Sequence, residues 1–285
     1  MIAARSHDPA TRVPFYWRDP RGRPQEVEVG SLALEHLSAL SRWPHWLQAD
    51  LQRVSLTLQR EALADALGEM NAALRAEGLI VAWRDEPFPL YSAAGEALGV
   101  SMERAATRFW GSLTLGAHCN GFVADDSGRP QRLWIARRSP TKATDPGKLD
   151  NLIGGGVPLG QTPRETVQRE GWEEAGLRAE QMQGLRPGRV IRLLRDIPEG
   201  LQREWVYVYD LALPDGAVPS NQDGEVAELT LHALPDALAL AASTEMTVDA
   251  SLVTLDFALR HRLLTADAHA ALSSATGDIF VAGSA

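Results

Sequence analysis

One stretch of the chain combines a glycine-rich loop, a helix start and three closely spaced glutamates. Residues 155–177 read GGVPLGQTPRETVQREGWEEAGL, with Glu170, Glu173 and Glu174 at positions i, i+3 and i+4. On an α-helix these spacings place the side chains on one face. Three carboxylates there repel one another unless a cation lies between them, and oxygen ligands of this kind suit Mg²⁺ or Mn²⁺. The alternative is an acidic helix face that contacts only solvent.

The residues around the glutamates indicate where the helix begins and ends. Residues 162–165 read TPRE, the pattern of a capping box with proline in the first helical position. Gly176 is placed to end the helix after roughly three to four turns. The glycines at 154–156 and Gly160 give the preceding loop a backbone that can approach a ligand closely. We therefore expect a loop and then a helix whose acidic face starts halfway along.

This arrangement resembles the Nudix box, G-x5-E-x7-R-E-U-x-E-E-x-G-U, in which U is aliphatic. The positions that match in register are Gly155, Arg169, Glu170, Glu173, Glu174, Gly176 and Leu177. Gln161 replaces the first Glu of the pattern. Gly171 replaces the aliphatic residue after Arg-Glu, and it weakens the helix by about 1 kcal/mol relative to alanine. The resemblance implies a Nudix hydrolase that binds metal through its intact glutamates.

The resemblance also implies site residues and a reaction. The expected metal ligands for Mg²⁺ or Mn²⁺ are Glu170, Glu173 and Glu174, and the expected catalytic residues are Glu170, Glu174, Arg169 and Glu225. Water attacks a phosphorus of a diphosphate with the help of the metal. Glu170 is a candidate base as well as a ligand, and Glu225 is the candidate for a second carboxylate that completes proton removal. We expect Arg169 to orient the carboxylates, and Gly155 and Gly156 to contact substrate.

The character of the sequence changes near residue 112. Residues 31–75 carry leucine and other apolar residues at helical spacings, which predicts a mainly helical region with some strand. We expect residues 1–112 to form a smaller, mainly helical α+β N-terminal domain. Because no linker rich in Pro, Gly or Ser follows it, we expect this domain to help form the substrate pocket. The alternative is that it only stabilises or dimerises the protein.

From Gly111 onward the sequence shows short strands separated by turns. The runs at 120–124 and 132–136 predict a hairpin that leads to the glycine-rich loop. After the predicted helix, residues 204–211 have strong β propensity, and residues 252–264 predict a terminal helix. We expect residues 113–285 to form the Nudix hydrolase domain, an α/β/α sandwich with a mixed sheet.

Further segments resemble one branch of the superfamily, the thiamine-pyrophosphokinase-associated Nudix proteins, in which the Nudix domain follows an N-terminal extension. The segments are VPFY at 13–16, WRDE at 83–86 with Tyr91, ERAA at 103–106, GAHCNG at 116–121, ARRS at 136–139, PGKLDN at 146–151, YDLALP at 209–214 and DGEV at 223–226. This resemblance implies hydrolysis of thiamine diphosphate, and preferentially of its oxidised damaged forms, to the monophosphate and phosphate.

Two other classes of function stay open. One is a general nucleoside-diphosphate-X pyrophosphatase acting on ADP-ribose or dinucleotides, and the other is a noncatalytic Nudix-fold binder. The intact glutamates argue against the binder, whereas Gln161 keeps it open. An isomerase on the same fold is more remote, because it would need Cys119 to be poised for catalysis.

Four basic residues follow the predicted hairpin, and we expect them to converge near the acidic helix. They are Arg137, Arg138, Lys142 and Lys148. Arginine offers a fork of donors to phosphate oxygens, whereas lysine acts as a point charge. Because neighbours on a strand face opposite sides, we expect at least one of Arg137 and Arg138 to be a surface charge. Arg137 and Lys148 are the candidates for contacting the diphosphate.

His118 is a further candidate for substrate binding, although a lone histidine in such a segment is more often a structural hydrogen-bonding residue. Cys119 has no paired base nearby in sequence and is expected to be a small buried residue. Several aromatic residues could stack on a heterocycle but are more often core residues. They are Trp17, Trp83, Trp134, Trp205 and Tyr209.

Composition limits the partners and the location. The chain has 285 residues, 45% hydrophobic and 23% charged, as expected for one large or two ordinary globular domains. A net charge of −9 disfavours nucleic acid as a partner. Because a diphosphate is also an anion, its binding requires cations placed locally at the site. The single cysteine, the absence of a long apolar run and the absence of a signal-peptide core lead us to expect a cytoplasmic protein without a membrane segment. A homodimer stays open.

Overall fold

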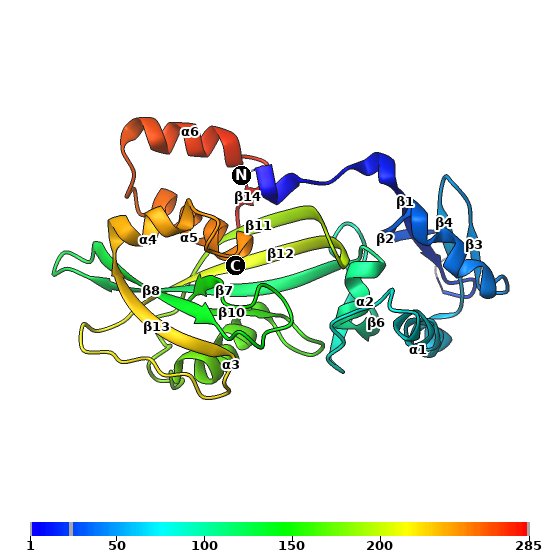
Figure 1. The fold of residues 1–285 in the computed structure, drawn as a ribbon, viewed down its shortest axis with the longest axis horizontal. Coiled ribbons are helices and arrows are strands. Elements are labelled where there is room, and N and C mark those ends of the chain that lie inside the picture. Colours follow the sequence, from blue (N-terminus) through cyan, green and yellow to red (C-terminus); the bar gives the residue numbers. More distant parts are fainter. Residues whose placement is uncertain (1, 23–24, 284–285) are drawn as a thin grey trace.

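The computed structural model describes residues 2–22 and 25–283. Figure 1 shows a smaller N-terminal domain beside a larger domain built on a long sheet. Within the described residues, no helix has the length and apolar character needed to cross a bilayer. The mixed α/β fold with a smaller N-terminal domain agrees with the prediction.

The N-terminal domain consists of a four-stranded sheet, a long helix, and a hairpin followed by a short helix. The strand order is β2-β1-β4-β3. Leucine and methionine side chains of the long helix are fully buried in the hydrophobic core of this domain. The elements are β1 (Arg12–Arg18), β2 (Val27–Ala33), η3 (Leu34–Arg42), β3 (Leu47–Ala49), β4 (Val54–Thr57), α1 (Arg60–Ala76), β5 (Pro87–Tyr91), β6 (Ala97–Glu103) and α2 (Arg104–Phe109).

This domain is less helical than the leucine spacing predicted. The second apolar run does form α1, but Leu32 lies in β2, and the segment after it is the 3₁₀-helix η3. Leu34, Leu37 and Leu40 recur every three residues, which fits the three residues per turn of a 3₁₀-helix. A run of apolar residues at this spacing therefore does not require an α-helix.

The larger domain has a mixed eight-stranded sheet whose main path is β13-β8-β7-β12-β11-β14. Strands β7 and β12 are parallel, and the other neighbours on this path are antiparallel. The elements are β7 (Leu113–Ala124), β8 (Pro130–Arg138), β9 (Leu149–Asn151), β10 (Ile153–Gly156), α3 (Pro163–Ala175), β11 (Arg186–Ile197), β12 (Gly200–Ala212), β13 (Val226–Ala233), α4 (Leu234–Ala241), α5 (Val248–Arg260), α6 (Ala266–Thr276) and β14 (Phe280–Val281).

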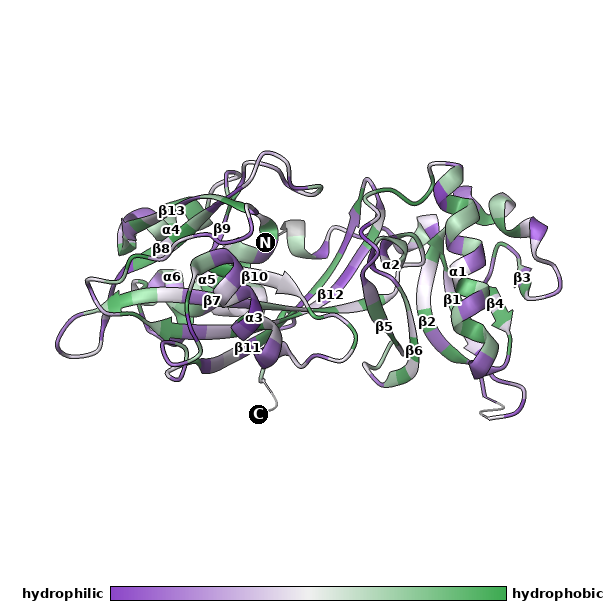
Figure 2. Cartoon of the chain, turned by 90° about the horizontal axis from the view of Figure 1, so that it is seen from below, coloured by the Kyte–Doolittle hydropathy of each residue, from purple (hydrophilic) through white to green (hydrophobic). Residues whose placement is uncertain are grey.

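Helices cover both faces of this sheet. Helix α3 packs on β7 and β10, whereas α4 and α5 lie on the opposite face (Figure 1). Separate hydrophobic clusters fill the two interfaces. Figure 2 shows α3 as a largely hydrophilic helix. The predicted α/β/α sandwich, the hairpin and the strand at 204–211 are confirmed, whereas α5 ends at Arg260 and α6 was not predicted.

The two domains contact each other along α2 and the β5–β6 hairpin. Helix α2 packs on β12, β5 packs on β7, and Arg203 of β12 forms an ion pair of 3.1 Å with Glu28. The first residues of the chain instead contact the larger domain, because η1 (Ile2–Arg5) packs on β11 and Asp8 donates its N–H to Asp196. A domain boundary between residues 112 and 113 stays a prediction.

Candidate active site

Helix α3 begins and ends where the sequence predicted. Thr162 Oγ1 accepts a hydrogen bond from the Glu165 N–H at 3.3 Å, and the Glu165 carboxylate accepts one from the Thr162 N–H at 2.8 Å. Gly176 adopts a left-handed φ of 64° at the C-terminal end, where a residue with a Cβ would be strained. Glu170, Glu173 and Glu174 therefore occupy the last two turns of a well-capped helix.

The side chain of Arg169 bridges two of the three glutamates. Its guanidinium donates to Glu170 at 2.7 Å and to Glu173 at 2.5 Å. The structure thus agrees with an orienting role for Arg169. The Lys142 ammonium lies 3.5 Å from Glu174 and also pairs with Glu225, so the predicted additional carboxylate lies beside the α3 cluster.

Glu174 is buried, whereas a glutamate on a solvent-facing acidic helix would be exposed. Only 5% of the residue is exposed, and its carboxylate accepts the Gly154 N–H at 2.8 Å. Burial raises the pKa of Glu174 to about 8, even though Lys142 lowers it. Burial also raises the pKa of Glu170, against the opposing effect of Arg169. Buried carboxylates of this kind gain from a nearby cation, which favours a role for the cluster beyond solvation.

The α3 glutamates fit a divalent metal by their chemistry. Across residues 2–22 and 25–283, no three His, Cys, Asp or Glu side chains are arranged as a metal cluster. At α3, Arg169 and Lys142 pair with the carboxylates. The oxygen donors are nevertheless those that Mg²⁺ and Mn²⁺ prefer. A Cβ at Gly155 would collide with the Glu170 carboxylate, so the glycine keeps strand β10 close to it. Glu170, Glu173 and Glu174 could hold the metal.

Both departures from the Nudix box have a structural explanation. The Gln161 amide oxygen accepts hydrogen bonds from Thr166 Oγ1 at 3.0 Å and from Arg169 Nε at 3.3 Å. Gln161 therefore braces Arg169 without adding a charge. A Cβ at Gly171 would lie 2.6 Å from the sulfur of Met182, which is fully buried. The absence of a side chain at Gly171 makes room for Met182 under α3.

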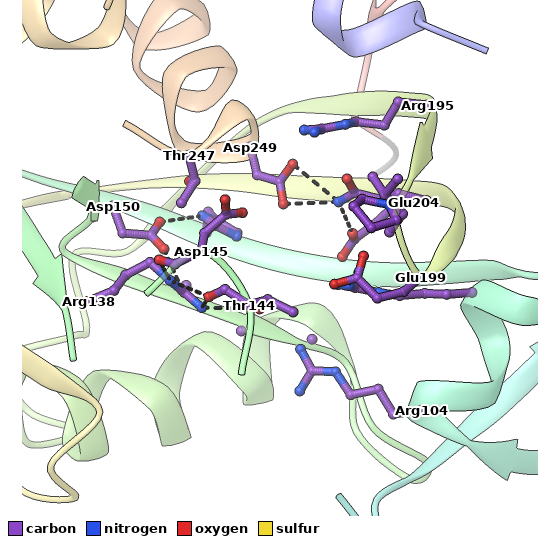
Figure 3. Close-up of a pocket in the computed structure, with 18 residues that line it drawn as sticks. Arg104, Arg138, Thr144, Asp145, Asp150, Arg195, Glu199, Glu204, Thr247 and Asp249 are labelled. Carbon is purple, nitrogen blue, oxygen red and sulfur yellow. Dashed lines mark hydrogen bonds and ion pairs between the residues drawn. The ribbon is translucent and has the colours of Figure 1, made fainter. Parts of the chain in front are cut away.

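Two cavities lie beside these residues. We call the first the outer cavity, and its volume is about 680 Å³. It is lined by Glu170 and Glu173 of α3, by Lys142 and Glu225, and by Arg84 and Arg104 of the N-terminal domain. The inner cavity, of about 240 Å³, includes Gly154, Gly155 and Gly156 of β10. Figure 3 shows it between the sheet, α5 and α2, with Arg104 entering from α2. Arg104 thus lines both cavities.

The inner cavity contains two neighbouring carboxylates. The amide nitrogen of Gln202 lies 2.8 Å from Glu204 Oε2 and 3.1 Å from Asp249 Oδ2 (Figure 3). Burial, followed by the charge of Glu204, raises the pKa of Asp249 to about 6. These two residues were not predicted, because they come from β12 and α5 and carry no motif of their own.

The structure brings some predicted substrate-binding residues to the cavities and not others. His118 is buried and lines the inner cavity, with Nδ1 3.0 Å from Asn151 Oδ1. Arg137 and Lys148 line neither cavity: Arg137 donates to the Gly147 carbonyl, and Lys148 pairs with Asp145. The placement of Arg137 differs from the prediction because neighbouring strand residues point in opposite directions, whereas Lys148 lies in the loop before β9.

Arg138 takes the inward position at the end of β8. Its guanidinium donates to Asp150 at 2.8 Å, and both residues line the inner cavity (Figure 3). The predicted core residue Cys119 is fully buried, and burial raises the pKa of its thiol well above the usual value, so a thiolate nucleophile is disfavoured. Among the aromatic candidates, Trp17, Trp134 and Tyr209 are buried.

Two family models match separate parts of the chain. Residues 116–251 match the NUDIX domain model, and residues 24–113 match a domain of unknown function, DUF4743. The chain is similar to Nudix hydrolase 20, chloroplastic, of Arabidopsis thaliana, with 35% identity over 212 residues that cover 73% of this chain and 56% of the relative. It is also similar to Nudix hydrolase 24, chloroplastic, of the same plant, with 34% identity covering 70% and 54%.

A solved structure from Deinococcus radiodurans is 24% identical, with a TM-score of 0.48, and the match covers 60% of this chain and 99% of that one. The chain spans about half the length of the curated relatives it matches. The predicted membership of the Nudix hydrolase family is confirmed by the family match and by the relatives. The chain therefore carries a Nudix domain, preceded by a DUF4743 domain.

Proposed function

We propose that the protein is a metal-dependent hydrolase that cleaves the diphosphate linkage of a small organic diphosphate. The observation that carries this proposal is the cluster of Glu170, Glu173 and Glu174, which lies beside the glycine strand β10 and of which Glu170 and Glu173 line the outer cavity. Mg²⁺ or Mn²⁺ bound there would neutralise phosphate charge and lower the pKa of a bound water.

The surrounding residues have separate roles in this proposal. Arg169 holds Glu170 and Glu173 in position through its two ion pairs. Glu225 faces the same cavity and is proposed to accept the proton of the attacking water, with Glu170 as the alternative base. Burial raises the pKa of Glu225, but the hydrogen bond and charge of Lys142, together with the charges of Arg84 and Arg104, lower it below the usual value, so the carboxyl is ionised at neutral pH.

Thiamine diphosphate and its oxidised forms are our first candidates for the substrate, with the monophosphate and phosphate as products. The resemblance of the WRDE, ERAA and GAHCNG segments supports this choice. The Glu204–Asp249 pair of the inner cavity also supports it, since two carboxylates favour an organic group that carries a positive charge or N–H donors, although arginines line the same cavity. The aminopyrimidine of thiamine has such donors.

Nucleoside diphosphate derivatives such as ADP-ribose or dinucleotides are the second candidates. The match to the Nudix domain favours them, and the amino group of adenine would also suit the carboxylates of the inner cavity. A noncatalytic binder is the third hypothesis. A cytoplasmic location and a homodimer stay proposals.

A phosphate-release screen separates these hypotheses. The purified protein is assayed with thiamine diphosphate, its oxidised forms, ADP-ribose and dinucleotides, each with Mg²⁺ and with Mn²⁺. We expect the highest kcat/KM for the thiamine compounds, and Glu173→Gln serves as the inactive control. A higher kcat/KM for ADP-ribose or a dinucleotide would select the second candidate. Binding without hydrolysis of any compound would select the third.

A further inference from the structure

Two segments of the N-terminal domain, WRDE and ERAA, interlock at the edge of the outer cavity. The Glu103 carboxylate accepts the backbone N–H groups of Arg84 and Glu86, both at 3.0 Å. In return, the Glu86 carboxylate accepts a hydrogen bond of 2.9 Å from the Arg104 guanidinium. Residues about twenty positions apart in sequence are thus joined into one unit that holds Arg84 and Arg104.

The backbone around Arg84 is held in an unusual conformation. Ala82 and Asp85 both have a φ of 58°, a left-handed value that residues with a Cβ rarely adopt. The Trp83 indole N–H donates to Asp85 Oδ1 at 2.7 Å, and Glu103 holds the chain from the other side. Strained residues persist where the surrounding contacts require them, and they occur often at functional sites.

The Arg84 guanidinium lines the outer cavity without a bonded partner. In the described part of the chain, no side chain or carbonyl lies within hydrogen-bonding or ion-pair distance of it. Burial lowers the pKa of Arg84, and the charge of Arg104 lowers it further, against the opposing charges of Glu225 and Glu86. A group of guanidiniums that includes an unpaired member, facing the acidic α3 cluster across a cavity, suits an anionic ligand that can also bind metal.

Arg104 lines both cavities. Its guanidinium packs over the Phe88 ring at 5.0 Å, and a Cβ on Gly156 would come within 3.1 Å of it. Gly155, which precedes Gly156 in strand β10, borders Glu170. Arg104 is therefore positioned beside the backbone that lies against the α3 carboxylates.

We propose that Arg84 and Arg104 bind the phosphate groups of the substrate from the side opposite α3, so that the DUF4743 domain completes the diphosphate site. The inference deepens the proposed function and rests on it for the identity of the anion as a diphosphate. Arg84 supplies an unpaired fork of donors, and Arg104, which lines both cavities, is held in place by Glu86.

Calorimetric titration of inorganic pyrophosphate into the Mg²⁺-containing full chain tests this proposal. We expect Arg84→Gln to weaken binding about tenfold or more, because a charged hydrogen-bonding pair is lost. Arg84→Lys and Arg104→Lys keep the charge but lose the fork, so they should give smaller losses. Arg42→Gln is the matched control, since Arg42 lies on the same domain, is partly exposed and pairs with Glu77. Thermal unfolding shows that each variant is folded.

Wild-type affinity in Arg84→Gln would overturn the proposal, and so would failure of the wild type to bind pyrophosphate. Turnover distinguishes this inference from the proposed function. If Arg84 contributes to pyrophosphate binding but no diphosphate is hydrolysed, the hydrolase function fails and the inference stands. If diphosphates are hydrolysed with an unchanged KM in Arg84→Gln, the function stands and the inference fails.

Discussion

The outer and inner cavities differ in how their charges are paired. In the outer cavity, Glu170 and Glu173 are bonded to Arg169, while the cation of Arg84 has no bonded partner in the described structure. In the inner cavity, Glu204 and Asp249 share the neutral amide of Gln202, while Arg104, Arg108, Arg138 and Arg195 also line that cavity. The outer cavity suits an anion and the metal bound to it, whereas the Glu204–Asp249 pair of the inner cavity suits a cation or N–H donors.

This difference indicates how an acidic protein can take a diphosphate. The chain carries a net charge of −9, so repulsion of the anion must be offset locally. The positive charges gather where the DUF4743 domain contacts the Nudix domain, at Arg84, Arg104 and Arg108. A substrate that is anionic at one end and donor-rich at the other would match both cavities.

The largest effect is expected from Glu174→Gln. Loss of one metal-binding carboxylate should reduce kcat by about a thousandfold or more, since metal assistance lowers the activation barrier by several kcal/mol. The glutamine oxygen can still accept the Gly154 N–H, so the fold should be retained. Steady-state kinetics and circular dichroism check both expectations. Near-normal metal-dependent turnover in a folded variant would remove Glu174 from the site.

The next effect concerns the inner cavity and separates it from the outer one. Asp249→Asn should raise the KM of a cationic or donor-rich substrate by about tenfold, because a hydrogen bond to a charged group is weakened. The same variant should bind inorganic pyrophosphate as the wild type does, since Asp249 lines only the inner of the two cavities. An equal loss of affinity for both ligands would show that the cavities do not act separately.

The pH dependence of KM should also distinguish the inner cavity from the outer one. The pKa of Asp249 is raised to about 6, mainly by burial and then by Glu204, so the carboxyl is charged above this pH and neutral below it. Charges that also act on Asp249 include those of Asp150, His118 and Arg195. The KM of a cationic substrate should therefore rise as the pH falls below about 6. A KM profile that Asp249→Asn leaves unchanged in shape would assign the titration to another group.

A small effect is expected from Gln161→Glu, which restores the usual residue of the Nudix box. The added charge lies beside Arg169, which already pairs with two glutamates. We expect Mn²⁺ affinity to change by less than about fivefold, the range of a partly exposed ion pair. Metal titration of the two proteins checks this. A gain of several hundredfold would mean that Gln161 limits metal binding in this protein.

Local sequence signals predicted the helix of the site and the strands around it. The Thr162 capping box, Pro163 and Gly176 set the bounds of α3 through contacts within a few residues, which a sequence pattern records directly. The alternation of the hairpin strands and the β propensity of 204–211 likewise act locally.

The rest of the site depends on contacts between distant segments. Arg137 and Arg138 are adjacent residues of the same type, so the sequence does not show which of them faces the cavity. Their orientation depends on how β8 pairs with β9 and β13. Burial of Glu174 depends on Gly154 and Lys142, which are on other elements. Arg84 reaches the outer cavity only because the two domains pack together, which no local pattern shows.

The central claim is that the α3 glutamates hold the metal that supports diphosphate cleavage. The most direct measurement compares wild type and Glu173→Gln, both freed of metal by a chelator, for Mn²⁺ or Mg²⁺ binding and for phosphate release as metal is added back. Glu173 is partly exposed, so its replacement tests the metal site with little effect on packing. We predict that metal restores turnover in the wild type alone and binds Glu173→Gln more weakly. Equal metal binding and equal turnover in the two proteins would contradict the claim.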